Sequence, residues 1–341
     1  MAASEPLSRK ADHLRIAAAP GVLHRRAAGL DDVRLRHRAL PERDLADVRL
    51  DAELLGARLA APLVVSAMTG GTRAAALVNA RLGRAAAEQR VAMTLGSGRA
   101  LLEDRSLLPT YRAGRPGDRP PLLLANLGAV QLAGRAGPER AEELVDLLQA
   151  DGLSVHLNPI QEAVQPEGEP AFGGVAERIA ATVARLAPRP VVVKEVGFGM
   201  DAADVVLLRD AGVAAVDVAG AGGTNWALVE GRRDARAGDV AEAFADWGVA
   251  TVDALLAARA AAPGLPVIAS GGVRDGVQAA KCLALGARAA GMARPLLQAA
   301  QEDRAGAALA TAVEQLRIAT WAAGAPSADA LGHEHLAGAA A

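Results

Sequence analysis

Apolar positions fall into eight short runs, separated by longer segments with a different pattern. Each run is apolar throughout instead of alternating with polar residues, which is typical of parallel strands covered on both faces. Glycine or polar residues follow each run, as expected where a strand ends. The predicted strands are Leu63–Met68, Val91–Leu95, Leu122–Leu127, Leu153–Leu157, Val191–Val196, Ala214–Ala219, Val267–Ser270 and Ala287–Ala293.

Helical patterning fills most of the intervals between these runs. Strands that alternate with helices indicate βαβ units, and eight repeats favour a closed (β/α)₈ barrel, the TIM barrel, over an open sheet. The interval around residues 105–121 is rich in Pro and Arg, so we expect a short helix at most there. The predicted helices are Arg73–Arg90, Pro138–Ala150, Val175–Leu186, Ala202–Ala211, Val252–Ala262 and Gly276–Leu285.

The pattern predicts one α/β domain. We assign residues 1–60 to an N-terminal arm with its own helix, 61–320 to the barrel, and 321–341 to a flexible tail. Residues 220–251 are too many for an ordinary strand-to-helix connection, so this long loop is predicted to be functional.

Composition narrows the function classes. The 341 residues exceed the roughly 250 that such a barrel needs, and only 2% are aromatic. The core must therefore consist of Ala, Leu and Val, and a ring that stacks on a ligand must be one of very few or belong to a cofactor. A net charge of −2 without a basic stripe argues against nucleic acid.

Compartment and membrane signals are weak. The chain has a single cysteine, Cys282, so no disulfide can form within it, and a cytoplasmic location is expected. Cys282 lies in a helical stretch and is predicted to be a buried thiol. No uncharged run reaches the ~18 residues of a membrane span. The first residues have no apolar stretch of signal-peptide type.

Unusual polar residues follow the strands repeatedly. Barrel active sites lie at the C-terminal ends of the strands. Turn chemistry explains isolated Gly and Asn there, but not Thr, Asn, His, Gln, Glu and Lys converging on one face. We therefore predict a functional site built from SAMTGG, LGSGR, ANLGAVQ, HLNPIQE, KEVGFG, DVAGAGGTNW, ASGGVRDG and GMARP.

Two neighbouring strand ends indicate a phosphate site. Ser270, Gly271 and Gly272 follow the seventh strand, and Ala293 and Arg294 follow the eighth. Phosphate sites in barrels commonly use these two loops and a helix N-terminus. Glycine permits close approach of the backbone to the ligand.

Lys194 ends the very apolar fifth strand and needs an anionic or polar partner. Glu195 is one candidate, although strand alternation places the two residues on opposite faces. We favour an inward Lys194 beside the anionic ring of a cofactor.

Two further motifs receive plain structural interpretations. Gly197-Phe198-Gly199 resembles a dinucleotide fingerprint, with Asp217 at a suitable distance, but the strands on either side continue the barrel. His333-Glu334-His335 lies in a Gly/Ala-rich segment and is interpreted as solvated tail instead of a metal site.

Together these segments resemble a known family, the type 2 isopentenyl-diphosphate isomerases. The resemblance extends from Arg9 to about Pro295 and is carried by RKxDHL, SAMTGG, NLGAxQL, HLNPxQE, VKEVGxG, AGxGGTxW, DWG and SGGVRxG with AKxLALGA. It implies a barrel that binds FMN and Mg²⁺ and interconverts isopentenyl and dimethylallyl diphosphate with reduced flavin. It also implies NADPH as the usual reductant and a homo-tetramer or homo-octamer.

The resemblance assigns roles to individual residues. Gln161 is expected beside the reacting alkene as a catalytic residue, together with Lys194, and Glu162 is expected to bind Mg²⁺. The substrate is expected to meet Arg9, Lys10, Ser97, Arg99, His156, Asn158 and Gln161. The flavin is expected to contact Ala67, Met68, Thr69, Ser97, Asn126, Lys194 and Thr224, and its phosphate Gly271, Gly272, Ala293 and Arg294.

Two positions depart from the family pattern. Gly98 stands where a larger polar residue is expected, and Asn225 replaces a smaller residue in GGTNW. Neither change removes a catalytic group, but both can alter how the substrate fits.

The chemistry agrees with the resemblance. Moving the double bond adds a proton at one carbon and removes one two carbons away, which an electron-rich reduced flavin can support. The main alternative is an FMN-dependent 2-hydroxy-acid oxidase, which shares the barrel and the strand-five Lys but needs a His base. No His lies between His156 and His333. A non-enzymatic flavin- or phosphate-binding protein leaves HLNPIQE without a purpose.

Overall fold

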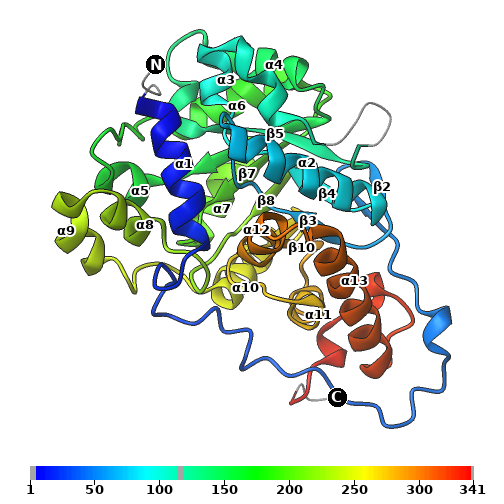
Figure 1. Cartoon of the computed structure of the whole chain (residues 1–341). Coiled ribbons are helices and arrows are strands. Elements are labelled where there is room, and N and C mark those ends of the chain that lie inside the picture. Colours follow the sequence, from blue (N-terminus) through cyan, green and yellow to red (C-terminus); the bar gives the residue numbers. More distant parts are fainter. Residues whose placement is uncertain (1–4, 114–118, 339–341) are drawn as a thin grey trace.

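Eight parallel strands form a closed barrel (Figure 1), as the apolar runs predict. The computed structural model describes residues 5–113 and 119–338, with side chains from Lys10 onward. Each barrel strand pairs with the next in the chain, and the last closes on the first. The barrel strands are β3 (Leu63–Val65), β4 (Ala92–Thr94), β5 (Leu123–Gly128), β6 (Gly152–Leu157), β7 (Val191–Glu195), β8 (Ala215–Asp217), β9 (Val267–Ala269) and β10 (Ala289–Met292).

Helices cover the outside of the barrel, and the six predicted ones are confirmed within a few residues. Local sequence starts several of them: the Thr72 side chain accepts from the Ala75 backbone N–H, and Asp275 caps in the same way. The α-helices are α1 (Glu5–Ala18), α2 (Arg73–Glu88), α3 (Arg99–Glu103), α4 (Gly137–Leu147), α5 (Pro159–Val164), α6 (Val175–Leu186), α7 (Ala202–Asp210), α8 (Trp226–Arg233), α9 (Gly238–Ala243), α10 (Thr251–Ala261), α11 (Gly276–Ala284), α12 (Arg294–Gln301) and α13 (Ala305–Ala322).

Short 3₁₀ turns occupy several connections. In the described part of the Pro- and Arg-rich interval, residues 105–113 and 119–121, the one helical element is such a turn, and the short α3 precedes it, as expected. The turns are η1 (Leu45–Asp47), η2 (Arg105–Tyr111), η3 (Ala129–Leu132), η4 (Ala235–Ala237), η5 (Ala328–Ala330) and η6 (His333–His335).

A small hairpin closes the end of the barrel opposite the site. It consists of β1 (Ala52–Leu54) and β2 (Ala57–Leu59), and its Leu54 and Leu59 pack on interior residues near the strand starts, including Val64. The interior is built from Leu, Val, Ala and Ile, as the low aromatic content requires. Burying this apolar layer stabilises the closed barrel.

The long loop of residues 220–251 contains α8 and α9 and is held by the N-terminal arm. The His24 N–H donates to the Gly223 carbonyl at 2.9 Å, and the Asn225 N–H donates to the Val22 carbonyl at 2.8 Å. Helix α1 packs beside α8 (Figure 1). The arm and this loop therefore meet at the end of the barrel where the strands finish.

Residues 321–338, assigned to a flexible tail, pack against the body of the protein. Ala325, Ala328, Leu331 and Leu336 are buried, and Leu336 forms a β-bridge with Leu35 of the arm. The expectation came from the Gly/Ala-rich composition, but a few apolar side chains suffice to anchor the segment. Residues 339–341 lie outside the described part.

Two smaller expectations concern Cys282 and membranes. Cys282 is fully buried, as predicted, and burial raises the pKa of its thiol to about 12. Among the described residues, every helix is too short or too polar to span a bilayer.

Candidate active site

A cavity of about 320 Å³ lies at the C-terminal ends of the strands and receives residues from all eight of them. Lys10 reaches it from α1 of the same chain. Arg9 has its backbone in α1, but its side chain lies outside the described part. All other predicted site residues line this cavity: Lys10, Ala67, Met68, Thr69, Ser97, Arg99, Asn126, His156, Asn158, Gln161, Glu162, Lys194, Thr224, Gly271, Gly272, Ala293 and Arg294.

The predicted phosphate site has the form of a backbone cradle. Gly271 and Gly272 have φ of +97° and +75°, and a Cβ on Gly271 would lie 2.1 Å from the Gly220 carbonyl oxygen. Helix α12 begins beside them without a side-chain cap, which leaves its first N–H groups for a ligand.

The Arg294 side chain holds the N-terminal helix α1. Its guanidinium donates to the carbonyls of Ala17, Ala18 and Ala19 at 3.0–3.2 Å and thereby fixes the end of α1. A phosphate contact from Arg294 would consequently come from its backbone N–H.

Lys194 points into the barrel, as predicted. Its Nζ donates to the Glu195 backbone carbonyl at 2.8 Å and lies 3.7 Å from Asp217 Oδ2. The other Asp217 oxygen accepts from Ser270 Oγ at 2.6 Å. The ammonium therefore has a buried counter-ion, Asp217, that it shares with Ser270.

The Glu195 carboxylate faces away from Lys194 and explains the GFG motif. Its Oε2 accepts the backbone N–H groups of Val196, Gly197 and Phe198 at 2.5–2.6 Å and that of Gly199 at 3.2 Å. Burial raises the pKa of Glu195 to about 7, against the effect of these donors. A carboxylate of the chain thus occupies the amides that a dinucleotide would need.

His156 is a neutral member of the wall. Its Nδ1 lies 2.8 Å from Asn126 Oδ1. Burial, together with the charges of Lys194 and Lys10, lowers the pKa of His156 to about 4. At neutral pH the imidazole is therefore uncharged and adds hydrogen bonding without charge.

Glu162, on α5, is held ready by three donors. Its Oε1 accepts from Asn158 Nδ2 at 2.9 Å, while its Oε2 accepts from Gln165 Nε2 at 3.0 Å and from the Glu169 N–H at 2.8 Å. These contacts fix the orientation of the carboxylate.

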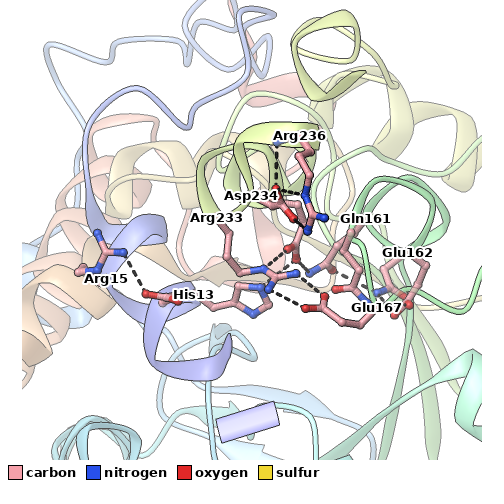
Figure 2. Close-up of polar contacts among 12 residues, drawn as sticks. His13, Arg15, Gln161, Glu162, Glu167, Arg233, Asp234 and Arg236 are labelled. Atoms are coloured by element: carbon pink, nitrogen blue, oxygen red, sulfur yellow. Dashed lines mark hydrogen bonds and ion pairs between the residues drawn. The ribbon is translucent and has the colours of Figure 1, made fainter. Parts of the chain in front are cut away.

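Gln161 is oriented by a carboxylate that sequence reasoning missed. Its Nε2 donates to Glu230 Oε1 at 2.8 Å, and Glu230 is fully buried. His13 Nε2 lies 2.9 Å from the same oxygen, in a close contact that is not well aligned for a hydrogen bond, and Arg233 Nε donates to Glu230 Oε2 at 2.8 Å. Figure 2 shows His13, Gln161 and Arg233 converging.

Charge at Glu230 is favoured strongly. Burial by itself raises the pKa of Glu230, but the contacts with His13, Gln161 and Arg233 outweigh burial and lower it to about 2. The sequence held a usable signal, because Trp226 and Glu230 are four residues apart on a helix and share a face. Trp226 lines the cavity and meets the His13 ring edge-on at 5.3 Å.

Both departures from the family pattern lie outside the cavity wall. A Cβ on Gly98 would meet Leu144 Cδ1 at 2.4 Å, so a side chain there would point at α4. Asn225 is fully buried and caps α8 by accepting from the Leu228 N–H at 3.1 Å. Its extra amide serves the helix that carries Trp226 and Glu230.

Among the described residues of the cavity wall, four buried polar atoms lack a hydrogen-bond partner: His13 Nε2, Ser66 Oγ, Asn126 Nδ2 and Asn158 Oδ1. Such atoms need a partner from a ligand or water. Together with the glycine cradle and Lys194 they fit a polar ring that carries a phosphate, which is the form of FMN. No cluster of three or more His, Cys, Asp or Glu side chains suited to a metal occurs among the described residues.

Comparison with known proteins decides the family. Isopentenyl-diphosphate delta-isomerases from Stutzerimonas stutzeri and Xanthobacter autotrophicus are each 48% identical to this chain. The first match covers 96% of this chain and 95% of its relative, and the second covers 95% of each. The chain belongs to the isopentenyl-diphosphate delta-isomerase family.

A profile of the FMN-dependent dehydrogenase family also matches, over residues 161–338, and this agrees with the flavin-dependent, type 2 form of the isomerase family. A solved structure of a flavocytochrome b2 variant with benzoylformate has a TM-score of 0.69 and 18% identity, covering 97% of this chain and 82% of that one. The likeness to that oxidoreductase concerns the fold alone.

Proposed function

We propose that this protein interconverts isopentenyl diphosphate and dimethylallyl diphosphate, using reduced FMN and Mg²⁺. The observation that carries the proposal is that one cavity joins three predicted elements. They are the glycine cradle after β9 and β10, the cationic side chains from α1 and α3, and the Gln161–Glu162 pair on α5.

The flavin site follows from the chain's own groups. The backbone at Gly271, Gly272 and α12 would hold the phosphate of FMN, and Lys194 would lie by its ring. Bound reduced FMN would supply an electron-rich anionic surface and an exchangeable proton. Lys194 would stabilise negative charge on that ring, because Asp217, 3.7 Å from its Nζ, also accepts from Ser270 and so neutralises the ammonium only partly.

The substrate diphosphate needs cations and hydrogen-bond donors. Lys10 and Arg99 provide positive charge, and neutral His156 can hydrogen-bond without adding charge. Arg99 pairs with Glu103 and Glu169 at the cavity wall, at 3.1 and 3.2 Å. When a diphosphate binds, Arg99 would exchange these two half-exposed carboxylates for the more highly charged diphosphate.

Mg²⁺ would be held by Glu162 together with the substrate. Mg²⁺ usually binds through one or two carboxylates, several waters and substrate phosphates. A single oriented carboxylate suits this arrangement better than a closed metal cage. Gln161, fixed by Glu230, would face the alkene and orient the carbon that gains or loses a proton.

The 2-hydroxy-acid oxidase alternative lacks its base. The corresponding stretch after β8, Gly220 to Trp226, contains no His. His24, which contacts this loop, is absent from the cavity wall and lies against Phe198 instead. Burial lowers the pKa of His24 to about 4.

The test is anaerobic. The flavin is reduced once with NADPH or dithionite, isopentenyl diphosphate is added, and both the flavin spectrum and dimethylallyl diphosphate are followed. Many turnovers with an unchanged reduced spectrum are expected, because substrate and product have the same oxidation state. Product formed in step with flavin reoxidation, or bleaching of oxidised enzyme by a 2-hydroxy acid, would refute the proposal.

The remaining attributes rest on family resemblance. We infer NADPH as the reductant, a homo-tetramer or homo-octamer as the assembly, isoprenoid biosynthesis as the process and the cytoplasm as the location. Light scattering of the holoenzyme and a comparison of NADPH with NADH address the first two.

A further inference from the structure

Tyr111 is the only tyrosine of the chain and is almost fully buried beside the substrate end of the cavity. Its ring packs on Gly70, where a Cβ would lie 2.0 Å from Tyr111 Cε1. A phenylalanine would fill this space equally well. The hydroxyl therefore needs its own explanation, because burying it without partners costs free energy.

The hydroxyl connects the main chain to Lys10. It donates to the Ser97 carbonyl at 2.8 Å and accepts from Lys10 Nζ at 2.7 Å. Lys10 Nζ also donates to the same Ser97 carbonyl at 2.9 Å. An ammonium can only donate, so the direction of each bond in this triangle is fixed.

The phenol keeps its proton at working pH. Burial raises the pKa of Tyr111 above its ordinary value, and the charge of Glu103 raises it further. The hydroxyl can therefore donate to Ser97 and accept from Lys10 throughout the neutral range.

Among the residues of α1 whose side chains are described, Lys10 is the cation that lines the cavity. Its flexible side chain must become ordered when the substrate diphosphate binds. Fixing a lysine side chain costs rotamer entropy. The Ser97 carbonyl, in the connection after β4, and the Tyr111 hydroxyl, on η2, order the Lys10 ammonium before the substrate binds, so part of this entropy is already lost in the free enzyme. Preorganisation of this kind raises affinity without a new contact to the ligand.

We infer that Tyr111 is a positioning residue that holds the Lys10 ammonium for the substrate diphosphate. The inference rests on the proposed function, because Lys10 is assigned to the diphosphate there. Tyr111 acts through Lys10 and has no catalytic role of its own.

A double-mutant cycle of Tyr111→Phe and Lys10→Met tests the coupling, since both changes keep the apolar volume. Tyr111→Phe is expected to raise KM for isopentenyl diphosphate about five-fold, the effect of one hydrogen bond, with kcat nearly unchanged. In the Lys10→Met background the same change is expected to leave KM unaltered. FMN content and the thermal midpoint are measured for all four proteins.

Thr320→Val is the matched control for losing a buried hydroxyl. Its Oγ1 donates only to the Leu316 carbonyl, within α13, and it is fully buried. This variant is expected to lower the thermal midpoint and leave KM alone. If Tyr111→Phe does the same, or changes KM by the same factor with and without Lys10, the inference is wrong.

Binding of inorganic pyrophosphate, followed by calorimetry on the same four holoenzymes, separates this inference from the proposed function. If the wild type forms no dimethylallyl diphosphate, the proposed function is wrong. The coupling between Tyr111 and Lys10 can still be measured from the pyrophosphate affinities of the four proteins. Coupled losses of affinity support the positioning role. Additive losses, or a wild type that does not bind pyrophosphate, overturn it.

Discussion

Arg233 and Glu230 lie one turn apart on α8, and Arg233 Nε donates to Glu230 Oε2 at 2.8 Å inside the protein. The Glu230 side chain is fully buried and that of Arg233 is 11% exposed. Arg233 also pairs with Glu167, so it joins α8 to the segment that follows α5 (Figure 2). The pair fixes the carboxylate on which the orientation of Gln161 depends.

We expect Arg233→Met to destabilise the protein by about 3 kcal/mol, because it leaves a buried carboxylate with too few donors. Urea unfolding of the apoprotein measures the change. The double variant with Glu230→Gln is expected to recover part of the loss, since no unpaired buried charge is left. Strictly additive losses would show that the two side chains act independently.

The stability contributed by Glu230 should depend on pH in one direction. Its pKa falls from an ordinary 4.5 to about 2 in the folded protein, so the folded state binds this proton less readily than the unfolded chain. The advantage of wild type over Glu230→Gln is therefore complete above pH 4.5 and is lost as the pH falls toward 2. Thermal unfolding of both proteins from pH 6 to 3 measures the difference; a gap that widens on acidification would contradict this.

Lys194→Met is expected to weaken FMN binding about ten-fold or more, the loss of one charged hydrogen bond, while the barrel stays folded. The measurement is the dissociation constant for FMN, with circular dichroism as the check on folding. Lys281→Met is the matched control, since Lys281 is a buried lysine on α11 whose Nζ donates to the Leu30 carbonyl, away from the cavity. Equal FMN binding in the Lys194 variant and wild type would remove Lys194 from the flavin site.

Glu162→Gln is expected to shift the Mg²⁺ titration of activity to roughly ten-fold or more higher concentrations, because a neutral amide is a poorer ligand for a hard cation. The amide oxygen can still accept from Asn158, so the local fold should persist. Replacing the neighbouring Gln161 should instead lower kcat without moving the Mg²⁺ midpoint. An unchanged titration for Glu162→Gln would refute the metal role.

The strands and most helices could be predicted because their signals are local. Runs such as Val191–Val196 are apolar on both faces, and only a strand covered on both sides buries such a run. The position of the site followed as well, because parallel strands in a barrel all end on one face. Residues next to those strand ends, such as Lys194 and Gly271, could therefore be assigned from the chain alone.

Partnerships between distant segments could not be predicted. His13 and Glu230 are far apart in sequence, and each is an ordinary helix residue until α1 packs beside α8. Lys10 and Tyr111 meet only because α1 brings Lys10 against η2 and the connection after β4. The same holds for the Arg294 guanidinium, which fixes the end of α1.

The sequence by itself determined the barrel, the face that carries the site and the chemical types of the groups on it, because period, apolarity and strand-end position are properties of short segments. Only the tertiary structure decided which groups touch, which carboxylates are buried and which cations are already engaged. Those outcomes depend on burial and on hydrogen-bond partners that long-range packing brings together, as at Glu230, where His13, Gln161 and Arg233 reverse the effect of burial on the pKa.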